Sequence, residues 1–347
     1  MQIAIYYGVI RVFGWLSRNY LVDLGSYKTV VYSTDDGIVF NEPTCLVVKK
    51  ERGKETVLSI GLEALECLGR TPEGVEVVFP IRNGVVVNFK AAQIYLQKVF
   101  NKLGKSFLFP NANRIFVVVP SFLSDVEKRT FIDLFGEFAK TVKLAPSCLA
   151  NAFGVSKSAG APKTTLIVDL GGGKTEIVVL SLTDVVFISS LRVGGKSFDE
   201  AIVNFVKREF LFQIGELTAE QIKRNTLSLD PVLDTTPVEV RGMNLELGLP
   251  ASIKLSSADL RLAVFDSVNL IKQGILMVLE SSPPELAGDI VSTGINLVGG
   301  MAYTRGLAEY LSKELQVKTN VCPNAHIISV LGMAKLFESP ELTQLIR

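Results

Sequence analysis

The chain has 347 residues, 48% of them hydrophobic and 20% charged, with a formal net charge of +1 at pH 7. This length is sufficient for two domains with separate cores, and this composition is typical of a folded protein rather than a disordered one. The near-neutral charge argues against a strongly basic nucleic-acid-binding protein.

Cysteine and histidine are too sparse and too scattered for the commonest metal and catalytic sites. The four cysteines, Cys45, Cys67, Cys148 and Cys322, form no Cys-x-x-Cys pair, which argues against a zinc site or a disulfide framework and favours a reducing cytoplasm. His326 is the one histidine in the sequence, so we expect it in a loop or at a helix start rather than in a catalytic triad.

The N-terminal segment, residues 1–18, is strongly apolar and includes Trp15, but it is interrupted by Arg11 and Arg18. No stretch of the sequence reaches the ~18 to 20 uninterrupted apolar residues of a membrane-spanning helix. The segment also lacks the small-residue cleavage site of a secretory signal. Two interpretations remain open: a helix lying in a membrane surface, or an extra element packed on the core.

The tetrapeptide Val-Asp-Leu-Gly occurs twice, at 22–25 and 168–171, each time between two apolar runs. Each copy predicts strand, tight glycine turn and strand, a hairpin whose turn amides can face an anion. Asp23 and Asp169 enter the two turns, where a carboxylate can hold a hydrated divalent cation. Together the hairpins could hold the phosphates of a nucleotide from opposite sides. The alternative is two ordinary hairpins with an incidental aspartate.

Further elements follow the first hairpin. Residues 115–120 read as an apolar strand of the kind buried on both faces. Ser124 and Glu127 have the spacing of a capping box for a helix expected over 125–139. The other predicted elements are strands within 37–48 and at 57–60, a short helix at 63–68 and a helix at 90–103.

After the second hairpin the order repeats, which predicts two related α/β halves divided near residues 145–160. The long amphipathic helix expected at 260–279 is stopped by Pro283 and Pro284. The other predicted elements are apolar strands up to 193, helices at 197–208 and 216–224, strand and loop over 231–255, a buried strand at 295–298 and a helix at 303–315.

Two Asp-Leu-Gly hairpins followed by Leu-Val-Gly-Gly at 297–300 resemble the ATPase superfamily of actin, hexokinase and the heat-shock chaperones. Asn-Glu-Pro at 41–43 and Leu-Gly-Arg-Thr-Pro at 68–72 resemble, more narrowly, the MreB/Mbl family of bacterial actin-like cell-shape proteins. Matching segments extend over roughly residues 20–340. The resemblance implies an actin-like two-lobed ATPase fold, with duplicated α/β halves and a nucleotide cleft between them.

The resemblance also implies how the chain divides into domains. The expected parts are an N-terminal segment at 1–18, lobe I at 19–150 with 325–347 packing back on it and a small subdomain at about 36–84, and lobe II at 151–324 with a small subdomain at about 191–254.

ATP or ADP with Mg²⁺ is the cofactor that the resemblance implies. Asp23 and Asp169 would anchor the Mg²⁺, largely through its waters, because magnesium dehydrates reluctantly. The implied nucleotide-binding residues lie in the two hairpins, on the helix at 216–224 and in the third glycine turn: Gly25, Ser26, Tyr27, Lys28, Gly171, Gly172, Gly173, Lys174, Glu220, Lys223, Gly299, Gly300 and Met301. For Glu220 and Lys223 a solvated salt bridge one helical turn apart is the alternative.

The chain departs from the family at catalytic positions. Family members usually carry a water-polarising glutamate where this sequence has Ala145, which cannot accept a proton. They usually continue the second hairpin with two threonines, whereas this chain has Lys174 and then Thr175, which leaves Thr175 as the one candidate catalytic residue. A lysine beside the γ-phosphate could tighten ground-state binding without activating water. We therefore expect ATP binding with slow or lost ATPase activity.

A second apolar anchor is expected at Phe107, Leu108 and Phe109, which in the resembling family belong to a loop that dips into the bilayer. Together with the Trp15 segment, this loop gives the chain two weak membrane anchors. Two such anchors can bind a membrane where a single one binds only marginally. Packing of Phe107 in the core is the alternative.

The expected function is that of an ATP-binding, membrane-associated bacterial actin homologue whose filaments organise cell-wall synthesis and cell shape. The expected partners are further copies of the chain in paired protofilaments, the membrane surface, MreB paralogues and cell-wall synthesis membrane proteins, but no nucleic acid. The expected location is cytoplasmic, at the inner face of the cell membrane. One alternative is a regulatory paralogue that copolymerises with an active MreB. A sugar kinase or a chaperone-type ATPase fits less well, because no substrate domain is evident.

Overall fold

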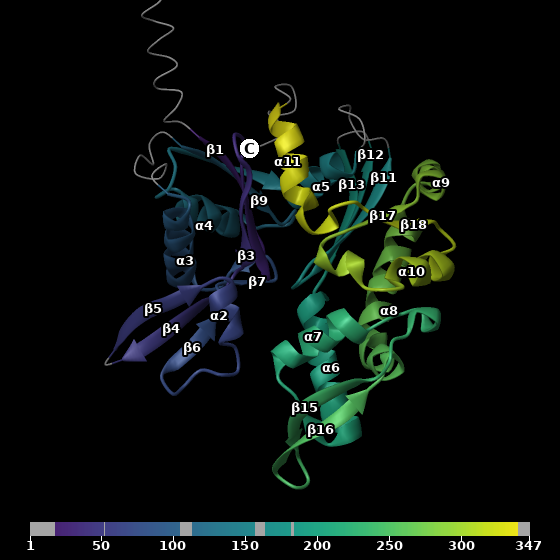
Figure 1. Cartoon of the computed structure of the whole chain (residues 1–347). Coiled ribbons are helices and arrows are strands. Elements are labelled where there is room, and N and C mark those ends of the chain that lie inside the picture. The colour runs from purple at the N-terminus through teal and green to yellow at the C-terminus, as the bar shows by residue number, and fades with distance from the viewer. Residues whose placement is uncertain (1–17, 52, 105–112, 157–163, 182–183, 339–347) are drawn as a thin grey trace, which may run out of the picture. The chain divides into compact units, whose positions relative to one another are not determined.

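The computed structural model describes residues 18–338, apart from 52, 105–112, 157–163 and 182–183. The chain divides into two compact units, unit 1 at 1–154 with 329–347, and unit 2 at 155–328 (Figure 1). Each unit is built on its own five-stranded mixed sheet with helices packed on it.

Unit 1 carries a sheet in the order β3-β2-β1-β9-β10. β1 pairs antiparallel with β2 and parallel with β9, and β9 pairs parallel with β10. Its strands are β1 (Asn19–Leu24), β2 (Lys28–Ser33), β3 (Gly37–Pro43), β9 (Arg114–Val119) and β10 (Thr141–Pro146). The helices are α3 (Phe89–Lys102), α4 (Asp125–Phe135), α5 (Ser147–Val155) and α11 (Ile328–Glu338).

A smaller sheet with the order β5-β4-β6 and a short hairpin complete the described part of unit 1. Their elements are β4 (Leu46–Glu51), β5 (Lys54–Ile60), α2 (Leu62–Glu66), β6 (Val75–Val78), β7 (Ile81–Arg82) and β8 (Val85–Val86). The β7–β8 turn contains Asn83 and Gly84, both with positive φ.

Unit 2 repeats the plan with a sheet in the order β13-β12-β11-β17-β18. β11 pairs antiparallel with β12 and parallel with β17, and β17 pairs parallel with β18. The strands are β11 (Thr165–Leu170), β12 (Thr175–Ser181), β13 (Asp184–Leu191), β17 (Ile295–Val298) and β18 (Thr319–Val321). The central strand of each sheet therefore ends in an Asp-Leu-Gly hairpin, and the duplication predicted from the sequence is seen in the strand order itself.

Five helices and a second small sheet with the order β14-β15-β16 complete the described part of unit 2. The helices are α6 (Gly195–Phe210), α7 (Glu216–Thr226), α8 (Ser257–Ser281), α9 (Pro284–Thr293) and α10 (Leu307–Leu315). The small strands are β14 (Phe212–Gln213), β15 (Val238–Asn244) and β16 (Leu249–Leu255), and the 3₁₀ turns are Pro231–Leu233, Gly300–Tyr303 and Ala325–Ile327.

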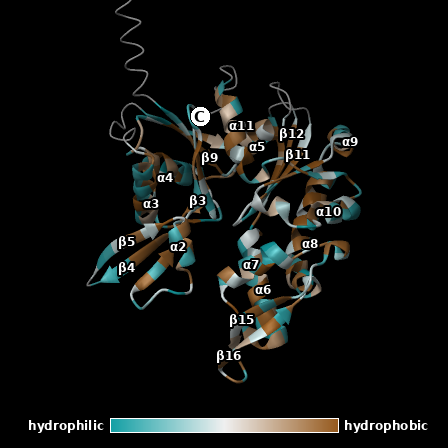
Figure 2. Ribbon diagram, in the orientation of Figure 1, coloured by the Kyte–Doolittle hydropathy of each residue, from teal (hydrophilic) through white to brown (hydrophobic). Residues whose placement is uncertain are grey.

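Each unit has its own core, formed where helices cover the central strands. In unit 1, Val22 and Val117 pack against α3 and α4 residues such as Leu96 and Phe131. In unit 2, Val168 packs with buried residues of α6 and α8. Figure 2 shows hydrophobic colour along β9 and β11, as expected of strands covered on both faces. The apolar strand predicted at 115–120 is confirmed as β9, in which five of six residues are buried.

α8 has the length and hydropathy of a membrane-spanning helix. However, Val264, Val268, Ile271 and Ile275 form a buried row on it at helical spacing, and they belong to the core of unit 2. The contacts of α8 with α6, β12 and β13 identify it as a core helix of the unit.

Two predicted helix boundaries are wrong. The helix expected over 125–139 has the predicted Ser124–Glu127 capping box but ends at Phe135, where Gly136 forms its C-cap. The helix expected over 303–315 begins only at Leu307, after a 3₁₀ turn. The cause is Gly306, whose φ of +74° and contact with the Asp230 backbone interrupt the helical conformation.

Candidate functional site

The first hairpin closes on a glycine turn between β1 and β2. The Gly25 amide donates to the Lys28 carbonyl oxygen at 3.0 Å, and a Cβ at Gly25 would lie only 2.8 Å from that oxygen. The Asp23 carboxylate lies beside the same turn, with Oδ1 3.8 Å from that Cβ position. Ser26 Oγ accepts a hydrogen bond from the Gly84 amide at 2.8 Å, so the hairpin is anchored to the β7–β8 turn.

Tyr27 completes this turn. It is half-buried, and its carbonyl oxygen accepts a hydrogen bond from the Thr44 amide at 2.9 Å. This bond joins the turn to the segment between β3 and β4. The roles of Ser26, Tyr27 and Lys28 toward a nucleotide stay predictions.

Ala145 lies at the carboxyl end of β10, a strand that was not predicted from the sequence. In the β1–β9–β10 ladder, Val118 pairs with Asp23 on one side and with Ala145 on the other. The three side chains therefore share one face of the sheet, and Asp23 and Ala145 are two strand spacings, or about 10 Å, apart. The unit thus places Ala145 at the same edge as the first hairpin.

The second hairpin has the same geometry and is joined to the start of α6. The Gly171 amide donates to the Lys174 carbonyl oxygen at 3.0 Å. The carbonyl oxygens of Gly171 and Gly172 accept hydrogen bonds from the amides of Gly195 and Lys196, at 3.1 and 2.8 Å. The first backbone amides of α6, which have no partner within the helix, thus donate to carbonyl oxygens of the hairpin. These bonds fix the start of the helix against the hairpin.

Gly194, immediately before α6, touches this hairpin closely. A Cβ there would lie 2.6 Å from the Lys174 nitrogen and 2.9 Å from the Gly171 carbonyl oxygen. A side chain at this position would push the hairpin away from the helix. Gly194 and Gly195 were not among the predicted site residues.

The residues that follow the second glycine turn are held by contacts within unit 2. The Lys174 ammonium forms an ion pair with Glu176 Oε1 at 2.6 Å, and the two side chains are 19% and 3% exposed. Thr175 is fully buried, and its hydroxyl donates to the Val193 carbonyl oxygen at 2.8 Å. The Thr175 hydroxyl therefore has a structural partner, and its candidate catalytic role stays a prediction.

α7 brings Lys223 onto the start of α6. Its ammonium donates to the Gly195 carbonyl oxygen at 2.9 Å and pairs with Asp199 Oδ1 at 2.6 Å. Glu220 pairs with Arg224 at 2.7 Å, one helical turn further along α7.

Asp199 titrates in an unusual range because of where it lies. Burial raises the pKa of its carboxyl to about 6, against the attraction of the Lys223 ammonium. Because this folded-state pKa lies above the ordinary value of 3.8, the carboxyl's contribution to stability is present in acid and is lost as pH rises through about 6. Above that pH the ionised Asp199 holds Lys223 in place.

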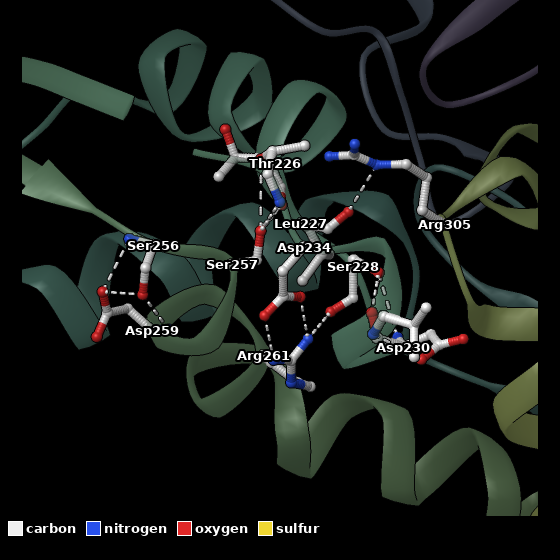
Figure 3. A network of polar contacts seen from close by, with 12 residues as sticks. Thr226, Leu227, Ser228, Asp230, Asp234, Ser256, Ser257, Asp259, Arg261 and Arg305 are labelled. Atoms are coloured by element: carbon white, nitrogen blue, oxygen red, sulfur yellow. Dashed lines mark hydrogen bonds and ion pairs between the residues drawn. The ribbon is translucent and has the colours of Figure 1, made fainter. Parts of the chain in front are cut away.

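A polar network fixes the loop that follows α7 (Figure 3). Arg261 on α8 donates to both carboxylate oxygens of Asp234, at 2.8 and 2.9 Å, and to the Ser228 carbonyl oxygen at 2.6 Å. The paired guanidinium holds the pKa of Asp234 below its usual range. Ser257 Oγ donates to the Thr226 carbonyl oxygen at 2.7 Å. These bonds tie the end of α7, and with it the helix that carries Lys223, to α8.

The third glycine turn packs against the second hairpin. Gly299 has a φ of +85°, and a Cβ there would collide with the Leu170 carbonyl oxygen and lie 2.7 Å from Asp169 Oδ1. Glycine at this position therefore makes room for the Asp169 carboxylate. Nothing lies within 4 Å of a Cβ placed on the next residue, Gly300.

Unit 2 brings several predicted residues to one point. A Cβ built on Gly195 would lie 3.6 Å from each of three atoms: Gly172 Cα, Lys223 Nζ and Met301 Cγ. The second hairpin, α7 and the third glycine turn thus meet at the start of α6. A backbone surface free of Cβ atoms, with one ammonium beside it, is suited to an anionic ligand approaching closely.

Carboxylates suited to a cation are sparse. Among the residues that the structure describes, no group of three or more His, Cys, Asp or Glu side chains is placed to hold a metal ion. Asp23 and Asp169 each lie beside a glycine of the predicted site. Single carboxylates of this kind fit a magnesium ion that keeps most of its water.

The predicted membrane residues Trp15, Phe107, Leu108 and Phe109 lie outside the described part of the chain. Their contacts, including the alternative of core packing for Phe107, stay predictions. His326 lies in the 3₁₀ turn before α11, beside the Tyr303 ring.

Solved structures with the same fold are actin-like proteins. MreB5 of Spiroplasma citri bound to ADP superposes with a TM-score of 0.88 at 27% sequence identity, covering 95% of this chain and 98% of that one. The same protein bound to AMPPNP gives a TM-score of 0.89 with the same identity and coverage. The MamK double helical filament gives 0.77 at 21% identity, covering 93% of this chain and 99% of that one, and shows the fold alone. The actin-like α/β fold expected from the sequence is confirmed.

Sequence comparison assigns the family. The family model described as MreB/Mbl protein matches residues 17–344. The cell shape-determining protein MreB of Escherichia coli (strain K12) is 35% identical over 329 residues, 94% of each chain. The cell shape-determining protein Mbl of Bacillus subtilis (strain 168) is 33% identical over 324 residues, 93% of this chain and 96% of that one. The chain belongs to the MreB/Mbl family, as its sequence motifs indicated.

Proposed function

We propose that this protein binds ATP with Mg²⁺ and assembles into membrane-associated filaments that organise cell-wall synthesis and cell shape at the cytoplasmic face of the membrane. The observation that carries the proposal is the pair of Asp-Leu-Gly hairpins, each on the central strand of a sheet with the same strand order. Membership of a family of cell shape-determining proteins supports the cellular role. A solved relative bound to ADP and to AMPPNP supports the ligand.

The chain's own residues suggest how the nucleotide is held. The turn amides of the two hairpins are suited to phosphate oxygens. Asp23 and Asp169 would hold a magnesium ion through its waters, and this ion would neutralise phosphate charge when bound. Gly300, where nothing lies within 4 Å of an added Cβ, would let the adenosine approach the backbone, and Met301 would supply an apolar surface. Gly299 would act indirectly, by making room for the Asp169 carboxylate. Lys223 would contribute from α7, where the Asp199 carboxylate already fixes its position.

Weak hydrolysis follows from Ala145, because a methyl group cannot orient or deprotonate water. Thr175 is not an obvious substitute, since its hydroxyl donates to the Val193 carbonyl oxygen. We therefore expect filament turnover to depend on nucleotide exchange, on a partner's ATPase activity or on the membrane.

The same departure at Ala145 favours a second candidate, a regulatory paralogue that copolymerises with an active MreB. Sedimentation of the protein alone and mixed with a relative that has the glutamate intact, with and without ATP and with phosphate release measured in the same tube, separates the two. Pelleting alone with ATP supports a stand-alone filament former, and pelleting only in the mixture supports the paralogue.

Asp169→Ala is expected to abolish the Mg²⁺-dependent part of ATP affinity, because it removes a carboxylate that anchors the hydrated cation. Fluorescent ATP titrated against the wild type and the variant, in Mg²⁺ and in EDTA, measures this part directly. Asp266→Ala, which removes an exposed carboxylate from α8, is the matched control and should leave it unchanged. If the ATP affinity of Asp169→Ala depended on Mg²⁺ as that of the wild type does, the second hairpin would not be the element that anchors the ion.

Membrane attachment is expected to require both apolar segments. A chain lacking residues 2–18 and carrying Phe107→Ser and Phe109→Ser should lose most of its flotation with anionic liposomes, since two weak anchors bind together where one is marginal. Phe265→Ser, which removes a 57% exposed phenylalanine from α8, is the control and should float as the wild type does. Undiminished flotation of the truncated variant would assign these apolar groups to the core.

A further inference from the structure

The second hairpin contains an ion pair between Lys174, a predicted nucleotide-binding residue, and Glu176, which has no role in the proposed function. Lys174 Nζ lies 2.6 Å from Glu176 Oε1, and the Glu176 side chain is only 3% exposed. A carboxylate so far removed from water requires a counter-charge, and Lys174 supplies it. The pair therefore fixes a lysine at the turn of the hairpin instead of leaving it loose in solvent.

The ladder between β11 and β12 places this pair next to Asp169. Glu176 lies directly opposite Asp169 in the antiparallel register, so the two carboxylates share one face of the sheet. Lys174 lies two residues before Glu176, immediately before β12, and its ammonium meets the Glu176 carboxylate. One fixed ammonium thus accompanies two carboxylates at the position proposed to hold Mg²⁺.

The ammonium also has capacity for a further ligand. A lysine carries three N–H donors, and the ion pair with Glu176 engages one side of it. Lys174 remains 19% exposed, and the glycine turn that precedes it offers amides to the same phosphates. Phosphate oxygens that approach the turn would therefore meet a fixed positive charge whether or not a metal ion is present.

We propose that Lys174 is a built-in cation of the phosphate site, which substitutes in part for Mg²⁺ in ATP binding and is restrained by Glu176. The inference rests on the proposed ATP binding. It adds that only a small part of the ATP affinity of this chain depends on Mg²⁺. Lys174 contacts the ligand directly, and Glu176 is a positioning residue that acts through Lys174.

The test measures ATP affinity in Mg²⁺ and in EDTA and takes the ratio of the two, without any measurement of turnover. We expect the ATP affinity of the wild type to fall by about tenfold or less in EDTA. Lys174→Met should raise the ratio by on the order of a hundredfold, which is the size of effect expected when one partner of a close charge pair is removed. Lys174→Arg should keep the low ratio. Lys207→Met removes an exposed lysine from α6 and is the matched control, with the wild-type ratio.

A variant of Glu176 is expected to change the affinity ratio in the opposite direction. Glu176→Gln should lower the ratio below that of the wild type, because the ammonium is freed for phosphate. In the double variant Lys174→Met, Glu176→Gln the buried carboxylate is removed together with the ammonium that balances it. Folding therefore does not carry the cost of a buried charge, and the ratio should still be raised as in Lys174→Met. Thermal melting of each variant checks that the compared proteins are folded.

The outcomes separate this inference from the proposed function. If the wild type binds no ATP in either condition, the proposed function fails. If it binds ATP but Lys174→Met keeps the wild-type ratio, the pair is only structural and the inference is overturned. A wild-type ratio in the double variant would also overturn it, by assigning the effect of Lys174→Met to the Glu176 carboxylate that this single variant leaves in place.

Discussion

Ala145→Glu is expected to raise the rate of phosphate release by about a hundredfold to ten-thousandfold, which corresponds to roughly 3 to 5 kcal/mol of transition-state stabilisation. Ala145 lies at the carboxyl edge of β10, on the same sheet face as Asp23 and about 10 Å from it. A glutamate side chain there can reach a water near the first hairpin and accept its proton. The measurement is single-turnover release of phosphate from ATP at saturating nucleotide.

Ala145→Gln is the matched control, because it has the size of the glutamate without its basicity. Both variants place a polar group at a buried position, so melting temperatures must show that they carry the same stability cost. Combining Ala145→Glu with Lys174→Thr should increase the gain further, since a fixed ammonium stabilises the bound phosphate in its ground state. A wild-type rate equal to that of a relative with the glutamate intact would contradict the prediction and would point to Glu176 as the group that activates water.

The parts of the fold that could be predicted depend on residues close together in sequence. Each Asp-Leu-Gly hairpin is defined by an apolar run, a carboxylate and a glycine turn, and both are confirmed as β1–β2 and β11–β12. The Ser124–Glu127 capping box is a contact over three residues, and it is present as predicted. β9 could be predicted because a strand covered on both faces is a continuous run of apolar residues, without the alternation of apolar and polar residues seen in half-exposed strands.

The parts that could not be predicted depend on contacts between distant segments. Gly306 interrupts a regular apolar pattern because its backbone meets Asp230, a residue far away in sequence. Lys223 pairs with Asp199 on the neighbouring helix α6, a contact that the spacing of residues on α7 does not indicate. The Lys174–Glu176 pair is close in sequence, but its significance depends on Asp169 across the ladder. Local patterns therefore indicated candidate site residues without giving their contacts.

α11 shows the same limit, because its packing depends on a glycine that the sequence does not distinguish from any other. It crosses α5 in unit 1 so closely that a Cβ at Gly332 would collide with the Ala150 carbonyl oxygen and lie 2.5 Å from the Gly154 nitrogen. The Lys335 ammonium donates to the Phe153 carbonyl oxygen at 3.0 Å, and the Phe337 ring lies 5.2 Å from that of Phe116 on β9. These contacts hold the end of the described chain on the sheet that carries the first hairpin.

Gly332→Ala is expected to lower the free energy of unfolding by about 2 to 3 kcal/mol. Alanine favours a helix over glycine by about 1 kcal/mol, but backbone atoms of α5 cannot rotate away from the new methyl group as a side chain could. The two helices must therefore separate, which weakens the contacts of Lys335 and Phe337. Urea unfolding followed by circular dichroism measures the change.

The matched control is Gly288→Ala in the middle of α9, where nothing lies within 4 Å of the added methyl group. This variant should gain about 0.5 to 1 kcal/mol through helix propensity alone, so the two substitutions of the same kind should change stability in opposite directions. A gain in stability for both would show that α11 can move off α5 without loss. In that case the close approach at Gly332 would not be what fixes the returning helix on unit 1.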